Sequence, residues 1–261
     1  MSEKQCWLSV ITVVKNDPQG FRRTLASLTS QDLSGVEFIV IDGSADAGEI
    51  QEILQSDPVE DSVYNWSEPL GIYEAMNRGL AIATGTFVYF ANAGDEFYKS
   101  DVLRKAREII SRENVQWAFG PVEIVEGDGK TVLTPQWNYA HEKAGAFSGG
   151  HFPAHQGTFV RTDLLRRVGG FSQQYSIVAD YAAFLRFSSI ADPEALTFPI
   201  ARFFEGGTST KHRKVSFREF HRARRQILNP SGAQAFREIL NTYRLYLMVF
   251  ITREIRPRLP F

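Results

Sequence analysis

The amino-acid sequence predicts an α/β fold with a mostly parallel central sheet, flanking helices and further helices at the C-terminal end. Two observations predict it: β-branched apolar runs alternate with helical patterns through the first half of the chain, and polar clusters follow three of those runs. Strands connected by helices form parallel sheets with right-handed crossovers. Because such sheets bind ligands beyond the carboxyl ends of their strands, the three clusters are expected to meet at one edge.

The first predicted elements are a strand at residues 7–14 and a helix that ends near Gln31. The strand is a continuous β-branched run, which is typical of a buried parallel strand. Asp17 and Pro18 follow it with the pattern of an N-cap and a proline in the first helical turn.

The same alternation continues to residue 110. Asp46 and Glu49 have capping-box spacing, so the second helix is expected to begin there. Strands are expected at residues 36–41, 62–66 and 86–91, and helices at residues 46–54, 71–83 and 102–110.

The second half of the chain is less regular. Residues 126–129 (Glu-Gly-Asp-Gly) are typical of a hairpin turn between strands at 117–125 and 131–135. Residues 144–153 are rich in glycine and aromatic side chains and are expected to form a mobile loop. The elements expected after it are a strand at 157–161, a helix capped by Thr162 and ending at Gly169-Gly170, a helix at 179–189, a strand at 195–204 and two closing helices.

Net charge divides the chain into two parts. Residues 1–210 hold 17 Lys/Arg and 27 Asp/Glu, a net charge of −10, whereas residues 211–261 hold 12 and 3, a net charge of +9. The total of −1 argues against a general nucleic-acid-binding protein. The basic segment is either a solvated helical face or a surface for an anionic partner.

Cysteine content and hydropathy indicate the compartment. Cys6 is the only cysteine, so no internal disulfide can form, which fits a reducing environment. No secretory signal pattern opens the chain, and no apolar run reaches the roughly 18–20 residues of a membrane span. We therefore expect a cytoplasmic protein, either soluble or peripheral on the inner face of the membrane.

The candidate chemistry begins with Asp95, which follows the predicted strand at 86–91. The sequence has neither of the common glycine-rich phosphate loops, no HExxH and no CxxC pair. Carboxylate ligands favour a hard cation, Mg²⁺ or Mn²⁺, and a metal on Asp95 could bridge the phosphates of a diphosphate leaving group. The structural alternative is that Asp95 only caps the next helix.

Other candidates also have structural alternatives. Asp42 could accept hydrogen bonds from a base or ribose, or could simply form an Asp-Gly turn. Asp180 could deprotonate an acceptor hydroxyl, or could only cap its helix. His151, His155 and Gln156 lie beside the expected loop, where they could contact an acceptor or a phosphate, although single histidines are more often structural.

Most of the candidate residues stand in a series of short motifs. They are SVITVVKN (9–16), VIDGSAD (40–46), SEP with GIYEAMNRG (67–79), FANAGD (90–95), HQGTF (155–159), GGF (169–171), ADY with FLR (179–186) and GGTS (206–209). Taken together and in order, these motifs resemble the family 2 glycosyltransferases, which have the GT-A fold with a Rossmann-like sheet. The resemblance covers most of the chain from Ser9 to about Ser209 and is closest to the subgroup that builds bacterial surface polysaccharides, including colanic-acid-type enzymes.

The resemblance implies roles for individual residues. Asp180 would be the catalytic base, with Arg186 as its companion on the same helix, and Asp95 would be the last acid of the D-x-D metal motif, holding Mn²⁺ or Mg²⁺. The residues implied at the nucleotide are Thr12, Val14, Asn16, Asp42, Ser44, Asn77 and Gly94, with Asp42 reading the base.

Three positions depart from the family pattern. Ala93 stands at the first acid of D-x-D, Ala179 stands at the acidic residue before the base, and Leu70 stands where the subgroup has an acid after Glu-Pro. The first departure implies weak metal binding, and the third affects phosphate or sugar contacts near Gly71.

The resemblance implies an inverting glycosyltransferase of the hexosyltransferase type. It would move a sugar from a nucleotide-sugar donor, most often a UDP-sugar, to a saccharide acceptor that is expected to be lipid-linked. A nucleotide-binding half at about 1–97 and an acceptor half at about 98–210 would form the GT-A domain, and 211–261 a basic helical extension. The alternatives are a sugar-phosphate nucleotidyltransferase and a non-catalytic nucleotide- or glycan-binding relative.

The last predicted helix carries apolar residues at helical spacing. They are Phe236, Ile239, Leu240, Tyr243, Leu247, Phe250 and Ile251. One interpretation packs this stripe on the domain. The other places the helix in the interface of a membrane with anionic lipid.

Overall fold

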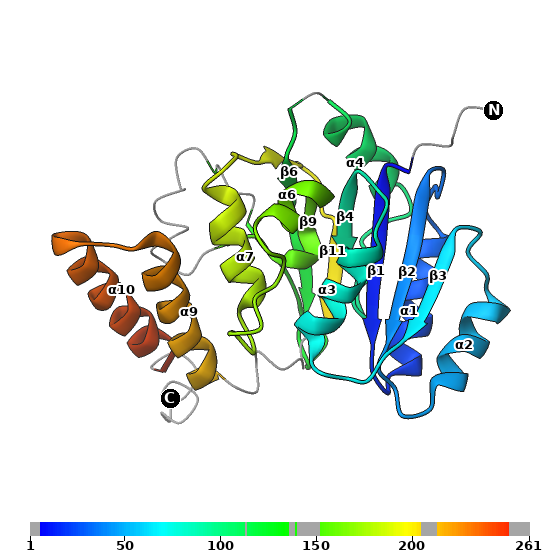
Figure 1. Cartoon of the computed structure of the whole chain (residues 1–261), viewed down its shortest axis with the longest axis horizontal. Helices are drawn as coiled ribbons and strands as arrows, with labels where there is room; N and C mark the ends of the chain where they lie inside the picture. Colours follow the sequence, from blue (N-terminus) through cyan, green and yellow to red (C-terminus); the bar gives the residue numbers. More distant parts are fainter. Residues whose placement is uncertain (1–5, 113, 136–138, 140–151, 205–212, 251–261) are drawn as a thin grey trace.

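The computed structural model describes residues 6–112, 114–135, 139, 152–204 and 213–250. They form an α/β fold built on a seven-stranded, mostly parallel sheet, with a smaller four-stranded sheet beside it and two helices at the C-terminal end (Figure 1). The predicted fold class is confirmed.

The central sheet contains the strands that the alternating pattern predicted. Its order is β10-β6-β9-β4-β1-β2-β3, and β1 pairs in parallel with both β2 and β4. β9 is antiparallel to its two neighbours, β4 and β6. The strands are β1 (Leu8–Val14), β2 (Val36–Asp42), β3 (Ser62–Trp66), β4 (Phe87–Phe90), β6 (Trp117–Phe119), β9 (Thr158–Arg161) and β10 (Glu194–Ala195).

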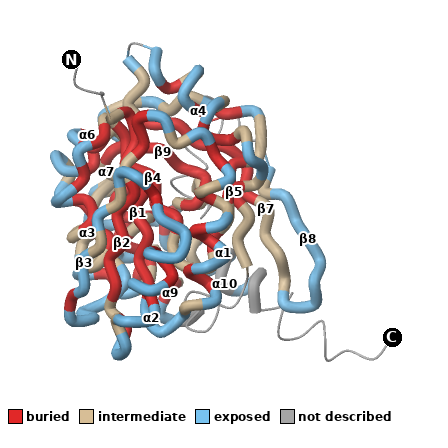
Figure 2. The backbone as a smooth tube through the Cα atoms, turned by 90° about the vertical axis from the view of Figure 1, so that its right-hand side faces the viewer, coloured by how far each residue is buried: buried red, intermediate tan, exposed pale blue. Residues whose placement is uncertain are grey.

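Two apolar cores lie on the two faces of this sheet. Alternate residues of β1 point to opposite faces, so Val10 belongs to one core and Ile11 to the other. One core is completed by α1 (Pro18–Thr29), α2 (Ala47–Ser56) and α4 (Val102–Ile110), and the other by α3 (Ile72–Ile82), α6 (Thr162–Arg167) and α7 (Ala179–Ser188). Figure 2 shows the result, a buried sheet inside an exposed outer layer.

The second sheet has the order β5-β11-β7-β8 and corrects two predicted strands. Residues 117–125 and 195–204 were each expected to form one strand, but each run divides between the two sheets, near Pro121 and Pro199. Proline has no N–H to donate to a neighbouring strand, so pairing is interrupted there. The strands are β5 (Glu96–Phe97), β7 (Val122–Val125), β8 (Thr131–Leu133) and β11 (Ala201–Phe204), and the expected β7–β8 hairpin is confirmed.

Two of the predicted helix caps are confirmed and one is wrong. Asp17 Oδ1 accepts a hydrogen bond from Gly20 N at 2.9 Å, and Asp46 Oδ1 accepts one from Gly48 N at 3.1 Å. The Thr162 hydroxyl donates instead to the carbonyl of Gly85 at the start of β4, so it joins α6 to the sheet. The expected loop at 144–153 lies mostly outside the described residues.

The chain closes with α9 (Arg213–Leu228) and α10 (Gly232–Phe250), which we call the C-terminal hairpin. α9 packs on α7, and α10 packs on α9 at the outer end of the molecule (Figure 1). Among the described residues, no helix combines the length and the apolar character that crossing a membrane requires.

Candidate active site

The carboxyl ends of β1 and β2 are joined by a pair of short hydrogen bonds. Asn16 takes up a left-handed conformation with φ of 53°. Its backbone N donates to Ser44 Oγ at 2.8 Å, and its Oδ1 accepts from Ala45 N at 2.9 Å. Asparagine tolerates this conformation better than most residues, so the turn after β1 is held in one shape against the turn after β2.

Asp42 is the fully buried last residue of β2, and both of its carboxylate oxygens are engaged. Oδ1 accepts from Ser44 N at 2.8 Å, and Oδ2 accepts from the Tyr64 hydroxyl at 2.7 Å. Burial, followed by the hydrogen bond and charge of Asp42, raises the pKa of Tyr64, so this hydroxyl stays a donor. In this structure Asp42 fixes its surroundings, and its contact with a base stays a prediction.

Thr12 and Val14 lie inside the sheet. The Thr12 hydroxyl donates to the Ala91 carbonyl at 2.6 Å, and the Val14 carbonyl accepts from Gly43 N at 2.9 Å. Both side chains are buried, so they position the edge to which the polar turns belong.

The turn after β4 presents Asp95. Gly94 has φ of 101°, which favours glycine, and its N–H is held by the Gly20 carbonyl and the Thr24 hydroxyl. Asp95 is 5% exposed, and its Oδ2 accepts from Asn92 N at 3.0 Å. Burial raises the pKa of Asp95 to about 7, against the opposing effects of the His155 charge and of hydrogen bonds from Asn92 and Gln156.

Asp180 lies in the first turn of α7, and three donors surround its carboxylate. Oδ1 is 2.9 Å from Tyr181 N and 3.0 Å from the Tyr73 hydroxyl, which also lies 2.5 Å from the Ile177 carbonyl, and Oδ2 is 3.3 Å from His155 Nδ1. Burial, then the charge of Asp180, raises the pKa of Tyr73, so its hydroxyl stays protonated. A carboxylate held in this way can accept a proton from a bound hydroxyl group.

The segment before Asp180 is held from the C-terminal hairpin. Glu219 of α9 accepts hydrogen bonds from the backbone N–H groups of Ser176, Ile177 and Val178 at 2.8, 2.9 and 3.3 Å. Although burial acts in the opposite direction, these bonds lower the pKa of Glu219. The entry into α7 is therefore fixed by the hairpin.

His155 connects the two acidic positions. Its Nδ1 faces Asp180, while its Nε2 lies 3.3 Å from Nδ2 of Asn92, the residue whose backbone N holds Asp95. Burial opposes protonation of the imidazole, but the hydrogen bond and charge of Asp180 and the charge of Asp95 outweigh it and raise the pKa of His155. We call Asn92, Asp95, His155 and Asp180 the acid–histidine cluster.

Comparison with models of protein families identifies the enzyme family. The model for glycosyl transferase family 2 matches residues 9–169, more than half of the chain. The chain belongs to glycosyltransferase family 2. Membership makes it a glycosyltransferase and confirms the resemblance seen in the sequence motifs.

Two curated relatives of this family 2 glycosyltransferase extend beyond the matched region. An uncharacterized glycosyltransferase of Mycobacterium tuberculosis is 30% identical over 214 residues, 80% of this chain and 79% of that protein. The amylovoran biosynthesis glycosyltransferase AmsB of Erwinia amylovora is 26% identical over 182 residues, 68% of this chain and 51% of that protein.

Solved structures share the fold at low sequence identity. TarS 1–349 of S. aureus in complex with UDP-GlcNAc has a TM-score of 0.69 and 17% identity, over 98% of this chain and 76% of that chain. Mannosyltransferase PcManGT from Pyrobaculum calidifontis, in complex with GDP-Man and Mn²⁺, has a TM-score of 0.64 and 15% identity, over 97% of this chain and 78% of that chain. The GT-A fold is therefore confirmed.

The site residues of this glycosyltransferase offer few metal ligands. Among the described residues, no group of three or more His, Cys, Asp or Glu side chains could hold a metal. The turn after β4 has two oxygen donors, the Asp95 carboxylate and Asn92 Oδ1, which is buried without a hydrogen-bond partner. Mg²⁺ and its analogues take one or two protein ligands and complete their shell with phosphates and water, so these residues fit a cation held jointly with a diphosphate.

Two of the predicted site residues, Asn77 and Arg186, have other surroundings than the acid–histidine cluster. The Asn77 amide donates to the Phe171 carbonyl at 2.7 Å and accepts from Phe171 N at 2.8 Å, so it clamps the segment after α6. Arg186 lies six residues after Asp180, on a different side of α7. His151 lies outside the described residues. Gln156, by contrast, is buried beside the cluster, where it donates to Asp95.

Residues that sequence reasoning left without a role also belong to this edge. They are Tyr64, Trp66, Tyr73 and Asn92, of which Trp66 is 53% exposed and donates from Nε1 to the Ser44 carbonyl at 3.0 Å. Tyr73 and Asn92 stand inside the quoted motifs, and a polar residue within a motif was the available signal. Trp66 ends a predicted strand at the carboxyl edge of the sheet.

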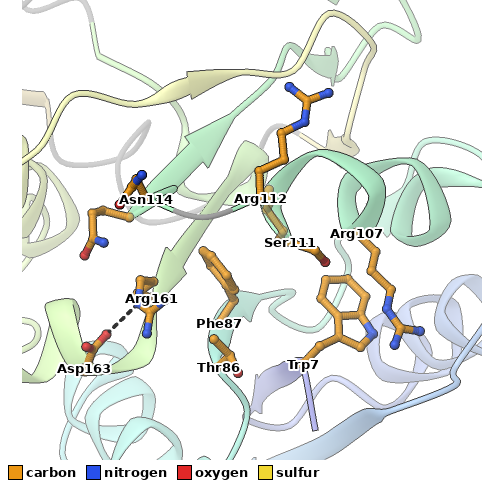
Figure 3. A pocket seen from close by; sticks show the side chains of 11 residues that line it. Trp7, Thr86, Phe87, Arg107, Ser111, Arg112, Asn114, Arg161 and Asp163 are labelled. Atoms are coloured by element: carbon orange, nitrogen blue, oxygen red, sulfur yellow. Dashed lines mark hydrogen bonds and ion pairs between the residues drawn. The ribbon is translucent and has the colours of Figure 1, made fainter. Parts of the chain in front are cut away.

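A separate cavity of about 590 Å³ lies at the opposite edge of the sheet, where β1 and β4 begin (Figure 3). Trp7 and Phe87 line it between Arg107 and Arg161, and the Arg161 guanidinium is paired with Asp163. It is remote from the acid–histidine cluster. By contrast, a cavity of about 30 Å³ beneath Asp180 and His155 is walled by apolar residues, including Phe90 and Phe171.

Proposed function

We propose that the chain is an inverting glycosyltransferase of the hexosyltransferase type. It transfers a sugar from a nucleotide-sugar donor, of which a UDP-sugar is favoured, to a saccharide acceptor in bacterial surface-polysaccharide synthesis. The supporting relatives are AmsB, named for amylovoran biosynthesis, and TarS, solved with UDP-GlcNAc. The acceptor is lipid-linked, and the enzyme works at the cytoplasmic face of the membrane.

One observation carries this proposal. His155 lies between Asp180, which begins α7, and the Asn92–Asp95 turn, which follows β4. We therefore assign Asp180 as the base for the acceptor and Asp95 as the carboxylate for the leaving group, on two sides of His155. Displacement at a sugar carbon requires this separation, because the acceptor enters opposite the bond that breaks.

The chemistry follows from the groups present. Asp180 takes the proton of the acceptor hydroxyl as its oxygen forms a bond to the anomeric carbon, while the bond from that carbon to the diphosphate oxygen breaks. The nucleoside diphosphate leaves and the anomeric configuration inverts. Tyr73 and the N–H of Tyr181 hold the carboxylate toward the acceptor, since both hydrogen-bond Oδ1.

Donor binding is assigned to the polar turns after β1, β2 and β4. Asn16, Ser44 and Gly94 contact the nucleotide, and Asp42 fixes the shape of that pocket. Asp95 and Asn92 Oδ1 would hold Mn²⁺ or Mg²⁺, which supplies positive charge to the diphosphate when bound. The Mn²⁺ complex of PcManGT supports a divalent cofactor. We assign His155 to the acceptor side, because its Nδ1 faces Asp180.

Asp180→Asn is the direct test. We expect turnover to fall by roughly 10²–10⁴-fold, since the amide cannot accept the proton, while donor affinity is unchanged. Release of nucleoside diphosphate is measured with UDP-GlcNAc and related donors, and a bacterial lipid extract serves as acceptor. The control is Asp163→Asn, which removes a carboxylate with 71% exposure at the other edge of the sheet.

A second outcome points to a non-catalytic nucleotide- or glycan-binding relative. Ala93 in place of the first acid of D-x-D, and the fully buried Ala179 before Asp180, are the observations that favour it. If wild-type protein binds a nucleotide but Asp180→Asn changes neither turnover nor acceptor binding, the transferase proposal fails and this one stands.

A further inference from the structure

Helix α10 exposes large apolar side chains along one side. The relevant residues, which we call the apolar stripe, are Phe236 (63% exposed), Ile239 (38%), Leu240 (52%), Tyr243 (70%) and Leu247 (56%). At 3.6 residues per turn they fall within an arc of roughly 100°. The interpretation that packed this stripe on the domain is therefore wrong for the described side chains.

The other side of α10 is fixed on α9. Arg224 Nε donates to Glu238 Oε2 at 2.7 Å, and Arg224 Nη2 donates to Thr242 Oγ1 at 2.7 Å. The Arg224 and Glu238 side chains are 2% and 7% exposed, so this buried pair sets the rotation of α10. The stripe faces outward because the polar side of the helix is the one that packs.

Positive charge borders the stripe. Arg237 and Arg244 are exposed and lie next to each other on one flank of it, at roughly 80–100° from Phe236 around the helix. The whole segment 211–261 has a net charge of +9, against −10 for residues 1–210. A broad apolar arc with arginines at its border is the pattern of a helix that lies in a membrane interface.

We propose that α10 docks on an anionic lipid bilayer, with the apolar stripe among the acyl chains and Arg237 and Arg244 at the headgroups. An anionic surface attracts this end of the molecule and repels the acidic body, so it also sets the orientation. A second copy of the chain fits less well, because it would bring two segments of net charge +9 together.

This docking rests on the proposed function and specifies where the acceptor is met. α9 joins α10 to the segment that leads into Asp180 through the hydrogen bonds of Glu219 to Ser176, Ile177 and Val178. The hairpin therefore holds the proposed base in a fixed relation to the membrane. An acceptor anchored in the same bilayer would be presented at a constant height.

The experiment is vesicle co-sedimentation of the full chain with phosphatidylcholine vesicles, with and without 30 mole per cent phosphatidylglycerol. We expect binding to the anionic vesicles that weakens as salt rises. Leu240→Asp combined with Leu247→Asp should reduce the partition coefficient at least tenfold, and Arg237→Gln with Arg244→Gln should remove most of its dependence on anionic lipid. Leu133→Asp is the matched control, because Leu133 is 50% exposed on β8.

Other outcomes would overturn the docking. Wild-type protein that fails to sediment with anionic vesicles at low salt contradicts it, as does an equal loss in Leu133→Asp. Self-association in analytical ultracentrifugation that Leu240→Asp abolishes, without vesicle binding, assigns the stripe to a second copy. Nucleotide binding and circular dichroism are recorded on every variant. Wild-type protein that binds nucleotide but not vesicles contradicts only this inference. Wild-type protein that binds vesicles but no nucleotide contradicts the proposed function.

Discussion

The Asp180 carboxylate takes its hydrogen bonds from separate parts of the chain. Tyr73 comes from α3, His155 begins the short 3₁₀ turn before β9, and the Tyr181 N–H belongs to α7 itself. Each donor restricts the carboxylate in a different direction. Single substitutions at the donors therefore test how far the position of this group controls turnover.

Tyr73→Phe removes one of these donors and keeps the ring. The hydroxyl shares one proton between the Ile177 carbonyl at 2.5 Å and the Asp180 carboxylate at 3.0 Å, so its loss at Asp180 is worth about 0.5–1.5 kcal/mol and we expect kcat to fall by roughly 2–10-fold. KM for the donor should stay the same, because Tyr73 contacts the proposed base and not the turns assigned to the donor. Steady-state kinetics at saturating donor check this, with Tyr98→Phe as a control. A matched loss of thermal stability and donor affinity would show a purely structural role.

His155 gives a pH dependence with a defined sign. Since its pKa is raised in the folded state, protonated His155 contributes stability that is fully present below its unfolded value of about 6.5 and is lost as pH rises through the folded pKa. We expect the thermal midpoint difference between wild type and His155→Gln to be larger at pH 5.5 than at pH 9. The midpoints are measured by calorimetry, and the comparison is repeated in proteins that carry Asp95→Asn, which removes the second titrating group. A difference that grows with pH contradicts the assignment.

The sequence predicted the main acidic residues of the site but not their partners. Asp95 follows a predicted strand and Asp180 begins a predicted helix, which are positions that local patterns reveal, whereas His155 was a candidate because it lies beside the expected loop. The contact between Tyr73 and Asp180 joins residues 107 positions apart, so no local pattern could reveal it. Asn77 was assigned to the nucleotide by its motif, whereas the structure places its amide on Phe171.

At the scale of elements, the C-terminal hairpin depends on one buried ion pair. Glu238→Ala leaves the Arg224 guanidinium buried and without its carboxylate, which costs about 3–5 kcal/mol in comparable cases. We expect α10 to lose protection in amide hydrogen exchange while the strands of the central sheet keep theirs. The double variant Arg224→Met with Glu238→Leu should restore most of that protection, since no charge is left unpaired. Equal loss in both variants would mean that the pair does not hold the hairpin.

Apart from the two-residue strand β5, elements up to α4 were predicted within a few residues, because capping residues and apolar periodicity are local signals. Strands β6, β7, β10 and β11 were not, because which sheet a strand joins is decided by distant partners. Pro121 and Pro199 marked the interruptions, but only the pairing shows that the chain changes sheet there. The orientation of the apolar stripe also depended on a tertiary contact, the Arg224–Glu238 pair.

At the scale of the whole molecule, ligand binding to the folded state raises its stability by mass action. A nucleotide at 100 times its dissociation constant adds about 2.7 kcal/mol. We expect the thermal midpoint to rise with UDP plus Mn²⁺ more than with UDP alone, and EDTA to reverse the metal-dependent part. The titration compares UDP, GDP, dTDP and CDP. A shift with another nucleotide reassigns the donor, and no shift with any of them removes support for a preformed donor site.

Substitution of Asp95 tests whether this carboxylate binds the metal. Asp95→Asn should remove the Mn²⁺-dependent part of the midpoint shift and leave the nucleotide-only part, because the pocket turns at Asn16 and Ser44 are untouched. An unchanged metal effect would place the cation elsewhere.

The charge boundary near residue 210 does not coincide with a boundary in the hydrogen-bonding of the fold. Glu219 accepts the N–H groups that precede Asp180, so a chain shortened at residue 210 would leave them without this acceptor. Chimaeras that exchange C-terminal segments between relatives at that point would separate the base from the residue that holds its loop. If the exchanged segment instead runs from the glycines after α6 to the end of the chain, Asp180 and Glu219 come from the same relative and keep their contact through the loop before α7.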